Sequence, residues 1–192
     1  MREIRILSLV CLGFISAILS HRDAWAQSCC AVGPRQTSTA VDGKKLPDCA
    51  LKDAEGREVR LSDFKGRAVV VGFWRAGSDA SRKQARYLNE LYIRHKEDGI
   101  KVVGIVLNSS QVDGEALHAL KAFVSESGLA YPVLAGDLEV LERCGIREEV
   151  TTFVLDRDGK VTKRYAGMSD ANDLEKQTTS LLSSGRRGWR IF

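Results

Sequence analysis

Two uninterrupted apolar runs of strand length constrain this chain more than any other feature. The first is Ala68–Trp74 (AVVVGFW) and the second is Ile100–Leu107 (IKVVGIVL). A strand exposed on one face alternates apolar and polar residues, whereas a strand buried on both faces is apolar throughout. Between the two runs, Ser81–Glu97 carries apolar residues at helical spacing. The sequence therefore predicts an α/β fold whose sheet is covered by helices.

The segments around these runs complete an alternating order of strands and helices. A turn at Asp53–Gly56 separates two short strands, and a turn at Asp156–Gly159 joins a terminal hairpin. The resulting order is β-β-β-α-β-α-β-α-β-β-α, which predicts a mixed central sheet flanked by helices. The other expected elements are strands at Arg57–Leu61, Tyr131–Leu134, Thr151–Leu155 and Val161–Tyr165, and helices at Gly114–Ser127, Leu138–Cys144 and Asp170–Leu182.

The first 26 residues have the pattern of a secretory signal. Two arginines in residues 1–5 precede an uncharged, mostly apolar run at residues 6–20, and Ala24 and Ala26 supply small residues for cleavage. The apolar run is short for a helix that crosses a hydrocarbon layer of about 30 Å. We therefore expect a cleaved signal peptide and an exported protein, periplasmic or extracellular, without a membrane span. The alternative is an uncleaved anchor through residues 6–20.

Composition divides the remaining chain into three parts. Residues 27–44 lack periodicity and are rich in small and polar types, so we expect a flexible linker. Residues 45–184 hold the alternating elements of one domain, and residues 185–192 are expected to form a loose tail. The net charge of +4 is small for 192 residues and gives no reason to expect a nucleic-acid partner. Because no glycine-rich phosphate loop is present, we expect no cofactor.

Several short motifs then point to one family. They are Leu46–Leu51 (LPDCAL), Leu61–Gly66 (LSDFKG), Val71–Trp74 (VGFW) and Thr151–Gly159 (TTFVLDRDG). In this order and at these intervals, the chain resembles the exported thioredoxin-like proteins of the TlpA/ResA type, within the redoxin (AhpC/TSA) superfamily. The resemblance covers about residues 45–184. It implies a thioredoxin fold with an N-terminal β-hairpin and the TlpA-type insertion, and it implies disulfide reduction in exported proteins.

The redox motif of that family is altered here. The family has Cys-x-x-Cys after the strand that ends in Phe-Trp, and Ser78 and Ser81 stand at both cysteine positions. Dithiol exchange needs an attacking thiolate and a second, resolving thiol. A helix N-terminus lowers the pKa of a thiol, but a serine hydroxyl stays protonated near neutral pH without a nearby base. We therefore expect these serines to cap the helix, since Ser81–Gln84 has the spacing of a capping box.

A second family feature is also missing. The family places a cis-proline just before Thr151, where this chain has Val150. A cis bond before a residue other than proline costs about 2.5–4 kcal/mol, so we expect the Glu149–Val150 peptide to be trans. The two losses predict a domain without dithiol exchange that binds an exported protein partner or serves as a scaffold. Charged residues expected at this face indicate a different partner or a solvated surface: Arg75, Asp79, Arg82, Glu148 and Glu149.

The cysteines outside this motif leave several possibilities open. Cys49 and Cys144 are expected to be buried and inert. The alternatives are a structural disulfide with Cys29 or Cys30, and a thiol oxidoreductase or peroxidase-like activity that uses Cys49 or Cys144. Vicinal thiols such as Cys29 and Cys30 could bind a soft metal, but no further ligand stands at suitable spacing, so we expect no metal site. The helical residue His95 is expected to be exposed.

Overall fold

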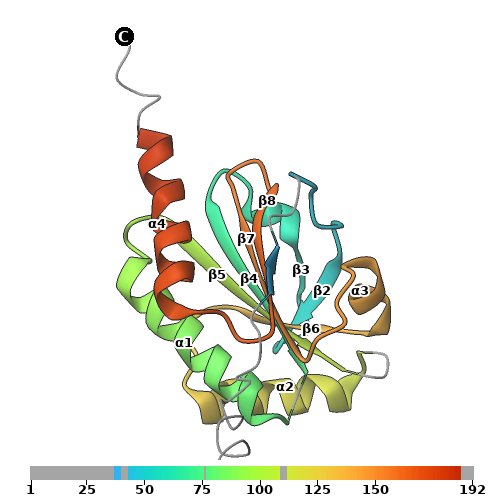
Figure 1. The fold of residues 1–192 in the computed structure, drawn as a ribbon. Helices are drawn as coiled ribbons and strands as arrows, with labels where there is room; N and C mark the ends of the chain where they lie inside the picture. Colours follow the sequence, from blue (N-terminus) through green and yellow to red (C-terminus); the bar gives the residue numbers. More distant parts are fainter. Residues whose placement is uncertain (1–36, 40–42, 76, 109–111, 187–192) are drawn as a thin grey trace, which may run out of the picture. The chain divides into compact units, whose positions relative to one another are not determined.

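The two apolar runs form the central strands of one mixed sheet. The computed structural model describes residues 37–39, 43–75, 77–108 and 112–186. Within them the sheet has eight strands in the order β1-β8-β7-β4-β5-β6-β2-β3 (Figure 1). The strands are β1 Thr37–Thr39, β2 Ala50–Asp53, β3 Glu58–Arg60, β4 Ala68–Arg75, β5 Ile100–Leu107, β6 Val133–Gly136, β7 Val150–Leu155 and β8 Val161–Ala166. The helices are α1 Asp79–His95, α2 Gly114–Ser127, α3 Leu138–Arg143 and α4 Ala171–Arg186, with a 3-10 helix, η1, at Leu61–Phe64.

The strand pairing is parallel at the centre and antiparallel on both sides. β4 pairs in parallel with β5, and β5 pairs in parallel with β6. β7 runs antiparallel to β4 and to β8, while β2 runs antiparallel to β3 and to β6. The mixed sheet flanked by helices that the sequence predicts is therefore confirmed. The predicted turn at Asp156–Gly159 joins β7 to β8, and the Gly159 N–H donates to the carbonyl oxygen of Asp156 at 3.0 Å.

Alternate residues of the central strands enter two separate apolar clusters. On β4, Val70 and Trp74 belong to the cluster on one face, and Val71 and Phe73 belong to the cluster on the other. This alternation is the period of two that strand geometry imposes. Both faces are therefore covered, which explains why the run has no polar residue.

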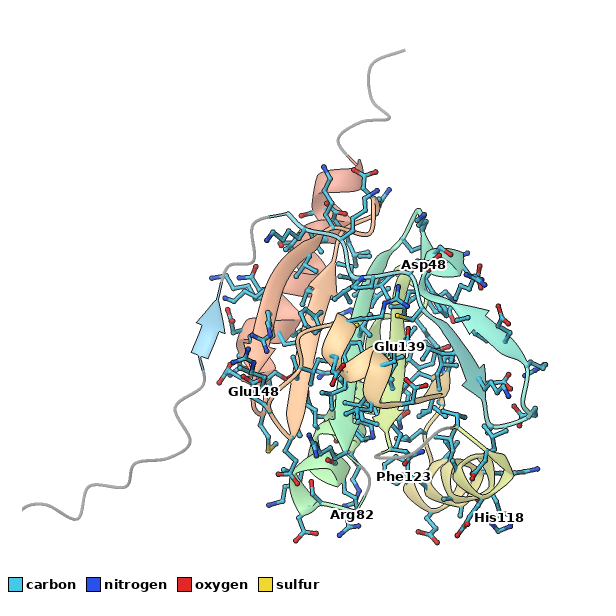
Figure 2. The ribbon with its side chains drawn as sticks, turned by 90° about the vertical axis from the view of Figure 1, so that its right-hand side faces the viewer. Asp48, Arg82, His118, Phe123, Glu139 and Glu148 are labelled. Atoms are coloured by element: carbon cyan, nitrogen blue, oxygen red, sulfur yellow. The ribbon has the colours of Figure 1, made fainter. Side chains whose placement is uncertain are left out.

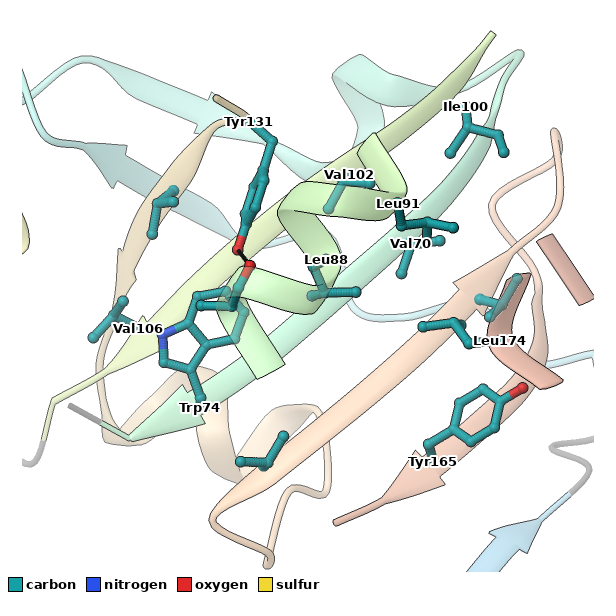
Figure 3. Packing of buried hydrophobic residues seen from close by; sticks show 14 of the residues in the cluster. Val70, Trp74, Leu88, Leu91, Ile100, Val102, Val106, Tyr131, Tyr165 and Leu174 are labelled. Carbon is teal, nitrogen blue, oxygen red and sulfur yellow. Dashed lines mark hydrogen bonds between the residues drawn. The ribbon is translucent and has the colours of Figure 1, made fainter. Parts of the chain in front are cut away.

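The first cluster lies beneath α1, α2 and α4. Leu88 and Leu91 enter it from α1, and Leu174 enters it from α4 (Figure 3). The Tyr131 hydroxyl lies inside this cluster and donates to the carbonyl oxygen of Ala85 at 3.1 Å. A buried phenol needs such an acceptor. The second cluster packs against α3 and η1, which lie on the other face of the sheet.

The structure corrects the predicted boundaries at both ends of the domain. Thr37–Thr39, within the predicted linker at 27–44, form β1 and pair antiparallel with β8. The physical reason is that β8 would otherwise be an edge strand with unpaired backbone groups. At the other end, α4 continues to Arg186, so the predicted tail at 185–192 begins too early.

The predicted signal peptide at residues 1–26 lies outside the described residues. So do Cys29 and Cys30, whose predicted roles the structure does not describe. Among the residues that are described, no helix is long and apolar enough to span a bilayer.

The close packing around Gly104 leads to a testable prediction. A Cβ atom at Gly104 would lie 2.5 Å from Cη2 of Trp74 and 3.0 Å from Cε2 of Tyr131. We expect Gly104→Ala to lower the free energy of unfolding by about 1–3 kcal/mol, because the core must shift to admit the methyl group. The measurement is urea denaturation followed by circular dichroism.

The matched control is Gly114→Ala at the first residue of α2, where a Cβ atom would meet nothing within 4 Å. We expect the control to be neutral or slightly stabilising, by up to about 1 kcal/mol, because alanine is the better helix former. Equal effects of the two substitutions would contradict this account of the core.

Candidate functional site

The first turn of α1 is built around two serine hydroxyls. Gly77, with φ of 91°, turns the chain after β4, and Ser78 is the N-cap of α1 in an extended conformation. The Ser78 Oγ accepts a hydrogen bond from the Ser81 N–H at 3.0 Å, and the Ser78 hydroxyl donates to the Ser81 Oγ at 2.8 Å. Ser81 is fully buried and Ser78 is half-buried. The hydroxyls therefore satisfy each other and one free N–H of the helix end.

The predicted capping role is confirmed for Ser78 and wrong for Ser81. The sequence places Ser81 at the cap with Gln84 closing a capping box. In the structure the helix begins at Asp79, so Ser81 lies inside it. The reason is that the N-cap needs extended backbone, which Gly77 permits at Ser78 one turn earlier.

Gln84 is a site residue whose role the sequence reasoning missed. Its Nε2 donates to the Ser169 Oγ at 2.6 Å and to the Thr152 Oγ1 at 3.3 Å. Its Oε1 accepts from the Ser169 N–H at 3.2 Å. All three residues are buried, so this network ties α1 to β7 and to the segment before α4. The available signal was the helical spacing of Gln84 with Ser81 and Leu88, which places a polar side chain on the buried stripe of α1.

The backbone at Val150 is trans, as predicted, since the described residues contain no cis peptide bond. Val150 is buried and lies opposite Trp74 in the β4–β7 ladder. The Arg75 N–H donates to the carbonyl oxygen of Glu149 at 3.1 Å, and the Gly167 N–H donates to that of Val150 at 2.8 Å. Both carbonyl groups are therefore engaged within the domain.

The charged residues predicted for this face partly satisfy one another. The Asp79 carboxylate accepts from Arg82 at 2.7 Å, and this hydrogen bond lowers the pKa of Asp79. The Glu148 carboxylate pairs with Arg164 at 2.8 Å. The backbone bond between Arg75 and Glu149 holds these two exposed residues next to each other at the end of β4. The face is thus polar and mostly self-paired.

The structure brings Cys49 and Cys144 together. Cys49 lies just before β2 and is buried, as predicted, with 3% of its surface exposed. Cys144 ends α3 and is half-buried in the same apolar cluster. Each thiol affects the pKa of the other, which places the two side chains close together in this cluster. The sequence leaves the pairing of the four cysteines at 29, 30, 49 and 144 open, because the proximity of Cys49 and Cys144 depends on β2 lying beside β6, the strand that leads into α3.

Burial controls the chemistry of these thiols. It raises the pKa of Cys49, and it raises the pKa of Cys144 to about 12, with the neighbouring Cys49 adding to the effect. A thiolate is the attacking species in disulfide exchange. At neutral pH both groups are therefore poor nucleophiles.

His95 is not exposed as predicted, because it joins α1 to α4. Its Nε2 lies 2.8 Å from the Glu175 Oε1, and its Nδ1 lies 3.0 Å from the Asp98 Oδ2. The hydrogen bond with Glu175, supported by the one with Asp98, raises the pKa of His95, and the same bond lowers the pKa of Glu175.

Comparison with known proteins decides the family. The model of the AhpC/TSA family matches residues 43–164. The chain belongs to the AhpC/TSA family.

Relatives of this AhpC/TSA-family chain include thiol-disulfide oxidoreductases. It is 31% identical over 135 residues to the thiol-disulfide oxidoreductase ResA of Bacillus thuringiensis subsp. konkukian, covering 70% of this chain and 75% of that protein. It is also 31% identical over 147 residues to ResA of Geobacillus thermodenitrificans, covering 76% of this chain and 80% of that protein.

Solved structures show the same fold. A crystal structure of a thiol:disulfide interchange protein DsbE from Chlorobium tepidum is 27% identical with a TM-score of 0.65, covering 75% of this chain and 99% of that one. The thioredoxin domain of a thiol-disulfide oxidoreductase from Bacteroides vulgatus is 25% identical with a TM-score of 0.62, covering 73% and 99%. The predicted thioredoxin fold is confirmed.

The contact between α1 and α4 predicts a pH dependence. Because the pKa of His95 is raised in the folded protein, protonated His95 adds to the free energy of unfolding. This stabilisation is complete below the ordinary pKa of 6.5 and is lost as the pH rises through the raised value. The lowered pKa of Glu175 means that its contribution is lost as pH falls below its ordinary pKa of 4.5. The His95–Glu175 pair should therefore stabilise the folded protein most between pH 4.5 and pH 6.5.

We expect His95→Gln to lower the free energy of unfolding by about 1 kcal/mol at about pH 5.5 and by less at about pH 8.5. The measurement is denaturant unfolding of both proteins at each pH. His118→Gln, on α2, is the matched control. A loss that is the same at both pH values for His95→Gln would contradict the assignment.

Proposed function

We propose that this chain is an exported AhpC/TSA-family protein of the TlpA/ResA type that no longer exchanges disulfides and acts as a protein-binding or scaffold module. One observation carries the proposal. The N-terminus of α1, where this family places its Cys-x-x-Cys pair, holds the hydrogen-bonded hydroxyls of Ser78 and Ser81. Two hydroxyls cannot be oxidised to a bond that stores two electrons, as two thiols can.

The surroundings of the serines support the same conclusion. A serine nucleophile needs a base within hydrogen-bond reach, and the partner of the Ser78 hydroxyl is the Ser81 Oγ. That oxygen belongs to a fully buried side chain whose neighbour in the next turn is the neutral amide of Gln84. The helix end is therefore a capped terminus without an activated nucleophile.

The strand beside α1 also argues against the family's way of docking a substrate. The resemblance implies that a cis-proline presents a free backbone edge to the substrate peptide. In this chain the carbonyl groups of Glu149 and Val150 are already bonded to Arg75 and Gly167. A peptide docking here would have to share acceptors that the domain already uses.

Exchange through Cys49 and Cys144 is the rival function. Their contact in the structure favours it, but Cys49 is buried and the pKa of Cys144 is raised to about 12. Enzymes that attack disulfides keep their nucleophilic thiol accessible and lower its pKa. The two cysteines have the opposite properties.

The binding role rests on the polar face at the end of β4. Exposed charged side chains of both signs lie there, among them Arg75, Glu149 and the Asp79–Arg82 pair. Such a surface suits a partner recognised through charge complementarity. An exported protein is the partner that the signal-like N-terminus and the family resemblance support.

Turnover of a disulfide substrate tests the loss of exchange. The full chain is incubated with a peptide disulfide and dithiothreitol, and thiol release is followed. We expect the rate to equal the uncatalysed rate, because the end of α1 carries Ser78 and Ser81 in place of a dithiol and the described thiols of Cys49 and Cys144 have raised pKa values. The variant Ser78→Cys/Ser81→Cys should accelerate the reaction at least tenfold, since the end of α1 stabilises a thiolate.

The control variant is Cys49→Ala/Cys144→Ala. Turnover by the unaltered chain would overturn the proposal. If that turnover disappeared in the control variant while folding was retained, the rival function would be established.

A further inference from the structure

The contact between Cys49 and Cys144 joins two segments that are far apart in sequence. Cys49 precedes β2, and Cys144 follows α3 on the same face of the sheet. The charges that act on Cys49 include Arg143 and Glu139 of α3 and its own neighbour Asp48. Cys49 therefore lies near α3. In Figure 2, Asp48 and Glu139 lie well away from Arg82 at the start of α1, so this cluster is separate from the serine site.

Local hydrogen bonds fix the backbone at both cysteines. On one side, the Asp48 Oδ1 accepts from the Ser62 N–H at 3.0 Å, which anchors the residue next to Cys49 to η1. On the other side, the Cys144 N–H donates to the carbonyl oxygen of Val140 at 3.0 Å. The Ile146 N–H donates to that of Leu141 at 3.0 Å. The two cysteines therefore lie in one apolar cluster on two separately anchored segments.

We propose that Cys49 and Cys144 are a disulfide-forming pair that links the segment before β2 covalently to the end of α3. The oxidant is a small-molecule disulfide, such as oxidised glutathione. Each protein thiol gives up one hydrogen, the two sulfur atoms form one bond, and the small disulfide is reduced to two thiols. Atoms and electrons balance without another reactant.

The bond has a structural role. Cys49 is 3% exposed, so a reductant reaches it poorly once the bond has formed. Burial also leaves little thiolate on either residue, which makes closure slow near neutral pH. A disulfide between segments so distant in sequence removes many conformations from the unfolded chain. It would therefore stabilise the domain without turning over substrate. The inference is independent of the proposed loss of exchange at Ser78 and Ser81.

Disulfide mapping tests the pairing. The full chain is reduced, freed of reductant, treated with oxidised glutathione, quenched in acid, alkylated and digested. We expect a cross-linked peptide pair that contains Cys49 and Cys144, which reduction separates. The Cys29→Ala/Cys30→Ala variant should give the same pair. Links from Cys49 or Cys144 to Cys29 or Cys30, or free thiols at both positions after treatment, would overturn the proposal.

Thermal unfolding tests the structural role. Oxidation should raise the midpoint by roughly 5–15 °C in the Cys29→Ala/Cys30→Ala variant. It should leave the midpoint of the Cys29→Ala/Cys30→Ala/Cys49→Ala variant unchanged. An equal or lower midpoint after oxidation of the first variant would overturn the structural role.

The turnover assay keeps the two proposals apart. Catalysis that depends on Cys49 and Cys144 would contradict the structural role and also the loss of exchange. Failure of the disulfide to form would leave the loss of exchange intact.

Discussion

The burial of β4 on both faces is the constraint on which the rest of the structure depends. The strand pairs with β5 on one side and β7 on the other, and its side chains alternate between the two apolar clusters. Because two neighbouring strands and two apolar clusters hold β4, the position of its last residue is fixed. The chain leaves the sheet at that point. Gly77 makes the turn, and α1 begins directly after its N-cap Ser78. The position of the candidate site follows from the core.

The fold places the serine hydroxyls and the cysteine thiols in environments with opposite effects on a negative charge. Hydroxyls stand at the end of α1, where helix N–H groups would favour a negatively charged thiolate. Thiols stand beneath α3, where burial disfavours that charge. The proposed loss of exchange and the proposed structural disulfide are therefore consistent with one principle. The reactivity of each group is set by its distance from water and from helix dipoles, and the fold is common to family members that do catalyse exchange.

Sequence alone predicted the parts of the fold that local pattern determines. The apolar runs at Ala68–Trp74 and Ile100–Leu107 became β4 and β5, and the turn at Asp156–Gly159 joined the expected hairpin. Patterns could not reveal contacts made across the sheet. The network around Gln84, the contact of Cys49 with Cys144 and the pairing of β1 with β8 each join segments far apart in sequence. The sequence could not decide which of Ser78 and Ser81 is the N-cap, because both are good capping residues.

The central claim is that the N-terminus of α1 would still stabilise a thiolate, and that it lacks exchange chemistry because Ser78 and Ser81 replace the two cysteines. Its most direct test is the pKa of the thiol introduced by Ser78→Cys in a chain with Cys11, Cys29, Cys30, Cys49 and Cys144 changed to alanine, measured from the pH dependence of its alkylation rate. The account predicts a pKa at least one unit below the ordinary value of about 8.5, because the Ser81 N–H that now binds the serine oxygen and the positive end of the α1 dipole would stabilise a thiolate. A pKa at or above the ordinary value would contradict the claim.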